Sequence, residues 1–109
     1  MKSFLTFTLL FGSLFGDEAE LLFNGNCVTC HHTTKSISAP SMRDVRQRYK
    51  DAFSTKEDFV KYMALFVTKP STEGSIMQDK IQKYKLMPLL GYEKSVVDEI
   101  ASYIYDTKF

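Results

Sequence analysis

Apolar residues recur along this chain at intervals of three and four, which is the spacing of one face of an α-helix. The clearest pattern covers 54–68, where the apolar face comprises Phe59, Tyr62, Met63, Phe66 and Val67. The same spacing predicts helices over 17–26, 72–84 and 93–106. No stretch alternates between apolar and polar residues as a half-buried strand does. We therefore expect an all-α fold of four or five short helices joined by long loops.

Turn-forming and capping residues predict where some of these helices begin and end. The run 33–41 is small and polar and contains Pro40, which indicates a loop. Ser41 is a typical N-cap and predicts a further helix that continues to about residue 50. Pro70 is expected to end the helix over 54–68.

The first 16 residues have the layout of a secretory signal peptide. Lys2 supplies a positive charge, the run from Phe4 to Phe15 is almost entirely apolar, and acidic residues begin at Asp17. This run is shorter than the roughly 20 residues that a membrane-spanning helix needs. We therefore expect cleavage after Gly16 and one domain over 17–109 without stable membrane insertion. An uncleaved membrane anchor is the alternative.

The remaining domain is short and formally neutral. Without Lys2, 13 basic residues stand against 13 acidic ones, and no sustained basic stripe is present, so we expect no nucleic-acid binding. Residues 17–109 contain no tryptophan, but they contain five phenylalanines and six tyrosines. A domain of this length has a small core, which a large apolar ligand would extend.

Both cysteines and both histidines lie within residues 27–32. Cys27, Cys30 and His31 form the pattern C-x-x-C-H, and on a helical turn these three positions share one face. The two sulfurs can then form thioether bonds to the vinyl groups of a haem while the imidazole of His31 reaches the iron. This spacing is the attachment signature of haem c. His32 points elsewhere and is expected at the surface.

Two other chemistries use cysteines at this spacing. A redox dithiol of Cys27 and Cys30 usually accompanies a βαβ pattern, which this chain lacks. A zinc site needs four ligands and usually draws two pairs separated by a longer loop. Here Cys27, Cys30, His31 and His32 are almost adjacent. The dithiol and the zinc site stay open as alternatives to haem c.

A second axial ligand for the iron is expected among the methionines, because a methionine paired with histidine is typical of electron-transfer haems. Met87 is followed by Pro88, which favours an extended backbone at Met87. A loop can therefore carry the Met87 side chain to the iron. Met42 lies too near the attachment site, on an expected helix start. Met63 and Met77 suit apolar core positions, and Met77 is the main alternative ligand.

With these motifs the chain resembles the small monohaem class I cytochromes c of the bacterial periplasm. The resemblance covers 17–109 and rests on CVTCH at 27–31, Ala-Pro at 39–40, KLMP at 85–88 and the closing IASYIYD. It implies a helical globule wrapped around one covalently attached haem c, in which the first and last helices cross.

Two contacts and a function follow from this resemblance. Phe23 should meet Ile100, Tyr103 or Ile104, and the carbonyl of Pro40 should accept the Nδ1–H of His31. The implied function is a periplasmic, monomeric one-electron carrier, not an enzyme, that meets redox partner proteins through an exposed haem edge. The alternative is a haem c enzyme or a gas or redox sensor with an open distal iron position. The candidate partners of the haem propionates are Arg43, Arg46, Arg48 and Tyr49.

Overall fold

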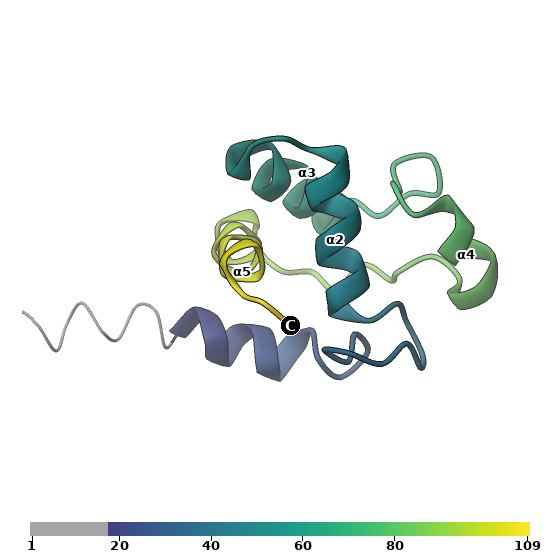
Figure 1. The fold of residues 1–109 in the computed structure, drawn as a ribbon, viewed down its shortest axis with the longest axis horizontal. Coiled ribbons are helices and arrows are strands. Elements are labelled where there is room, and N and C mark those ends of the chain that lie inside the picture. The colour runs from purple at the N-terminus through teal and green to yellow at the C-terminus, as the bar shows by residue number, and fades with distance from the viewer. Residues whose placement is uncertain (1–17) are drawn as a thin grey trace, which may run out of the picture.

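The computed structural model describes residues 18–109 (Figure 1). Within this range the chain is all-helical and contains no strand, so the predicted all-α class is confirmed. A first helix covers 18–26, and four more follow: α2 (Met42–Ala52), α3 (Lys56–Thr68), α4 (Gln78–Tyr84) and α5 (Lys94–Asp106). The expected signal peptide, residues 1–16, lies outside the described residues. No helix in the described part is both long and apolar enough to cross a membrane.

Side-chain caps explain where two of the helices begin. The Ser41 hydroxyl accepts the backbone N–H of Asp44 at 3.2 Å, and the Thr55 hydroxyl accepts that of Asp58 at 3.1 Å. Each bond satisfies an amide of the first turn, which has no partner inside its helix. The predicted start of α2 after Ser41 is confirmed.

The helix predicted over 72–84 is wrong in its first half, because α4 begins only at Gln78. The Ser71 hydroxyl accepts the N–H of Gly74 at 2.9 Å, and the Ser75 hydroxyl accepts that of Met77 at 3.1 Å. Such local bonds compete with helical hydrogen bonding. They hold 72–77 in a turn followed by a non-helical segment.

The core forms where the two ends of the described chain meet. Phe23 of the first helix is 1% exposed, and its ring centroid lies 5.4 Å from that of Tyr103 and 5.4 Å from that of Phe109. In Figure 1 the first helix runs across the view while α5 is seen almost end-on, so the two helices cross. α3 packs most extensively against α5. The other buried members of this core are Met42, Tyr49, Phe59, Met63, Ile100, Ala101 and Ile104.

A candidate ligand cavity beside Cys27, Cys30 and His31

A cavity of about 400 Å³ opens between the first helix and the four helices that follow. Its walls are mostly apolar, and its volume lies in the usual range for ligand sites. Cys27, Cys30 and His31 line it, and so does Met87, which is 56 residues further along the chain. The structure therefore brings the four sequence-predicted site residues to one cavity.

The backbone of 23–31 explains how the cysteines and histidine share a face. The N–H of Cys27 donates to the carbonyl of Phe23 at 2.9 Å, and the N–H of His31 donates to the carbonyl of Cys27 at 2.8 Å. Helical hydrogen bonding thus continues past the end of the first helix. Cys27 is half-buried, Cys30 is exposed, and both thiols are free.

The surroundings of Cys27 favour an uncharged sulfur. Burial raises the pKa of its thiol to about 11. A zinc ligand or a reactive dithiol must instead be a thiolate, and its pKa is usually lowered. Over 18–109, no three His, Cys, Asp or Glu side chains gather in a group able to hold a metal ion. The position suits a thiol or a thioether.

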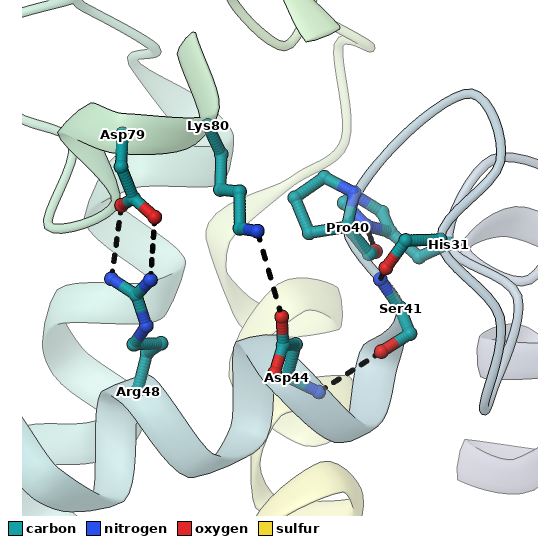
Figure 2. Close-up of polar contacts among 8 residues, drawn as sticks. His31, Pro40, Ser41, Asp44, Arg48, Asp79 and Lys80 are labelled. Carbon is teal, nitrogen blue, oxygen red and sulfur yellow. Dashed lines mark hydrogen bonds and ion pairs between the residues drawn. The ribbon is translucent and has the colours of Figure 1, made fainter. Parts of the chain in front are cut away.

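His31 is oriented by a hydrogen bond from its ring to the main chain (Figure 2). Its Nδ1 lies 2.8 Å from the carbonyl oxygen of Pro40. A carbonyl oxygen can only accept, so Nδ1 carries the hydrogen and Nε2 of the neutral ring keeps its lone pair. The loop that presents Pro40 is closed by a 2.8 Å bond from the N–H of Met42 to the carbonyl of His32. The ring of His31 is thereby prepared to ligate through Nε2.

His32 has a structural role that its sequence position did not reveal. Its Nδ1 accepts the backbone N–H groups of Thr34 at 3.2 Å and Lys35 at 3.1 Å. The side chain is half-buried and holds the start of the loop that leads to Pro40. His32 therefore does more than occupy the expected surface position, because its ring also accepts hydrogen bonds from the loop.

All four methionines of the described chain line the cavity: Met42, Met63, Met77 and Met87. Met42 and Met63 also belong to the main core, which confirms the core position predicted for Met63. Met77 is 7% exposed but lies outside that core cluster, and Met87 is half-buried. The two lining methionines outside the main core, Met77 and Met87, therefore lie on either side of α4 in the chain.

The segment that carries Met87 is fixed at both ends. Lys85 ends α4 with φ of +69°, a conformation that residues with a side chain rarely adopt. At the other end the Tyr92 hydroxyl donates to Oδ1 of Asn26 at 2.8 Å. Asn26 in turn donates from Nδ2 to the carbonyl of Leu22 at 2.8 Å. The loop is thus tied to the first helix beside Cys27.

The arginines predicted as carboxylate partners do not line the cavity. Arg46 donates to the carbonyls of Ile104 at 3.0 Å and Tyr105 at 2.8 Å, where a positive charge also favours the C-terminal end of α5. Arg48 pairs with Asp79, and Arg43 is exposed. Their positions on α2 did not reveal these partners, which come from distant parts of the chain. The structure thus gives Arg46 and Arg48 protein partners away from the cavity.

Two lysines supply the charge of the cavity instead. Lys80 and Lys85 line it, and none of the described lining residues is acidic. Tyr49 also lines the cavity, and burial raises the pKa of its hydroxyl group to about 12. The helical spacing of Met77, Lys80 and Tyr84 is the sequence signal that could have identified Lys80.

Comparison with known proteins adds no assignment to this geometry. No family model, no curated protein and no solved structure matches the chain. The function is therefore argued from the cavity and the residues that line it.

Proposed function

We propose that the protein is a one-electron carrier that holds a single covalent haem c. The observation that carries the proposal is the convergence of Cys27, Cys30, His31 and Met87 on one mostly apolar cavity. When bound, the haem supplies the redox chemistry through its iron, and the protein sets its potential and its access.

Cys27 and Cys30 are the attachment residues in this proposal. Each S–H adds across one vinyl group, so no atom is lost and both sulfurs end as uncharged thioethers. Burial of Cys27, which raises its pKa to about 11, supports this role over a thiolate role. The helical turn supports it too, because it turns both cysteines and His31 to one side.

His31 is the proximal ligand in this proposal, and Pro40 holds its ring. With Nδ1–H bonded to the Pro40 carbonyl at 2.8 Å, only Nε2 is available to ligate. The same bond makes the imidazole a stronger donor and limits its rotation.

Met87 is the distal ligand in this proposal. Its segment runs from the strained Lys85 to Tyr92, which is bonded to the first helix. The extended backbone before Pro88 is fixed at both ends, and this favours a constant ligand position in both redox states. Met77, which lines the same cavity, is the second candidate.

Lys80 and Lys85 are the proposed partners of the haem carboxylates. Both line the cavity, and Lys80 is held only loosely by Asp44, with its Nζ 3.9 Å from Oδ2. An ammonium group at this distance loses little interaction free energy when it turns toward a ligand carboxylate.

Electron exchange is proposed to occur at the mouth of the cavity, in the periplasm and from a monomer. Leu86 and Leu90 line the cavity and are also 37% and 44% exposed, so they lie at its edge. Leu89, between them, is 66% exposed. An apolar rim of this kind suits the small, short-lived contacts of redox partners.

The proposal is tested by producing the full chain in a host that attaches haem c and exports the product. The purified protein should gain the mass of one haem, resist extraction of the haem by acid and organic solvent, and show a haem c spectrum. The double variant Cys27→Ala/Cys30→Ala should carry no covalent haem. A colourless exported protein with two unmodified thiols would refute the proposal.

A further inference from the structure

α4 stands apart from the other helices (Figure 1). It has no buried residue, and its backbone packs against none of α2, α3 and α5. Its inward side chains, Lys80, Ile81 and Tyr84, line the cavity instead of a helix surface. The position of α4 therefore depends on contacts that cross the cavity or bridge its edge.

An ion pair at the cavity edge joins α4 to α2 (Figure 2). The guanidinium of Arg48 donates to both carboxylate oxygens of Asp79, at 3.0 and 2.6 Å. This fork geometry orients both side chains. The hydrogen bond from Arg48 also lowers the pKa of the Asp79 carboxyl. One turn earlier on α2, Asp44 lies 3.9 Å from Lys80, which is a much looser contact.

Both candidate methionine ligands are carried by the ends of α4. Met77 is the residue just before the helix, and Met87 follows its last residue, Tyr84, by three positions. A movement of α4 away from α2 must therefore displace one or both sulfurs from the cavity.

We infer that Arg48 and Asp79 are positioning residues. Their ion pair holds α4 near α2 and thereby keeps the Met77 and Met87 side chains at the cavity, beside the proposed iron. The inference rests on the proposed function, since it concerns access to the same site. Neither residue lines the cavity; each acts through α4, whose two ends lead to Met77 and Met87.

Two measurements on the haem-bound protein test this role. One is the rate at which imidazole displaces the methionine from ferric iron, followed by absorbance. The other is amide hydrogen exchange of peptides covering 78–84, with 56–68 as an internal reference. Arg48→Gln and Asp79→Asn should each accelerate both processes roughly two- to fivefold, as expected for loss of one exposed pair.

Matched variants separate this role from general destabilisation. The double variant Arg48→Gln/Asp79→Asn should be no faster than either single variant, because both singles remove the same contact. Asp106→Asn, which breaks the pair between Lys56 and Asp106 at 2.8 Å, should leave both rates unchanged. The effect of Arg48→Gln should also shrink in about 0.5 M salt, where exposed charges are screened.

Equal rates in wild type, Arg48→Gln and Asp79→Asn would overturn the inference. So would an equal acceleration by Asp106→Asn, or faster exchange in 56–68 as well as in 78–84. These results leave the haem proposal standing, which fails separately if the exported chain carries no covalent haem.

Discussion

The hydroxyl of Tyr92 donates a 2.8 Å hydrogen bond to Oδ1 of Asn26, and this bond joins segments that are 66 residues apart. One partner precedes Cys27 directly, and the other lies at the end of the loop that carries Met87. This hydrogen bond therefore links two sides of the cavity independently of the ion pairs that involve α4.

Replacing Tyr92 by Phe should lower the free energy of unfolding by about 1 kcal/mol, because the half-buried Asn26 oxygen loses its partner. Denaturant unfolding followed by circular dichroism measures the change. Tyr62→Phe is the control, since Tyr62 is 38% exposed and stacks flat on Phe53. Equal stability of the two variants would contradict the importance of the Tyr92 bond.

In the haem-bound form of the proposed function, replacing Met87 by Ala should open the iron to added ligands. The ferrous variant should bind carbon monoxide rapidly, and the ferric variant should lose the absorption band of thioether-to-iron ligation. Met77→Ala should retain both properties of the wild type. If Met77→Ala opens the iron and Met87→Ala does not, the distal ligand is Met77. Rapid binding by the wild type would favour the open-iron enzyme or sensor.

The stability of the protein should fall in alkali because of Tyr49. Burial raises its pKa in the folded protein to about 12, above the ordinary value of 10.0. The unfolded chain therefore loses the Tyr49 proton at a lower pH than the folded protein does. The free energy of unfolding consequently falls as the pH rises between these two pKa values. Tyr49→Phe cannot titrate, so relative to wild type it should gain about 2 kcal/mol between roughly pH 9 and pH 11.5. Parallel stability curves for the two proteins would show that Tyr49 ionises as freely in the folded state as in the unfolded one.

Lys85→Gly should stabilise the protein even though it removes a side chain. Lys85 has φ of +69°, where glycine is unstrained, and relief of strain of about 1–3 kcal/mol exceeds the entropy cost of glycine. The net gain should be about 1 kcal/mol in denaturant unfolding.

Lys83→Gly provides the opposite control for this effect. Lys83 is an ordinary residue in the last turn of α4, so glycine there should destabilise the protein by about 0.5–1 kcal/mol. A loss of stability in both variants would mean that the backbone at Lys85 is not strained.

The sequence predicted the parts of this fold that depend on local spacing. The apolar face containing Phe59 and Met63 identified α3, and Ser41 identified the start of α2 because capping joins residues only three positions apart. The start of α4 was missed because apolar spacing does not register the hydroxyls of Ser71 and Ser75.

The same distinction between local spacing and long-range contacts applies to the candidate site. Cys27, Cys30 and His31 are recognisable because one helical turn sets their relative positions. Long-range polar pairs have no such signal: Arg48 and Asp79 are 31 residues apart, and their pairing depends on how α2 and α4 are placed. The presence of Lys80 and Met77 at the cavity depends on the same tertiary arrangement.

The packing of Phe23 has a consequence for the order in which the protein matures. Its ring is covered by Tyr103 and Phe109, so a chain emerging from its N-terminal side cannot bury this residue until nearly all of the chain is present. Contacts of such long separation form late. Cys27 and Cys30, four and seven residues after Phe23, precede this late contact in the chain. Under the proposed function, haem attachment would take place before the final helix docks on Phe23.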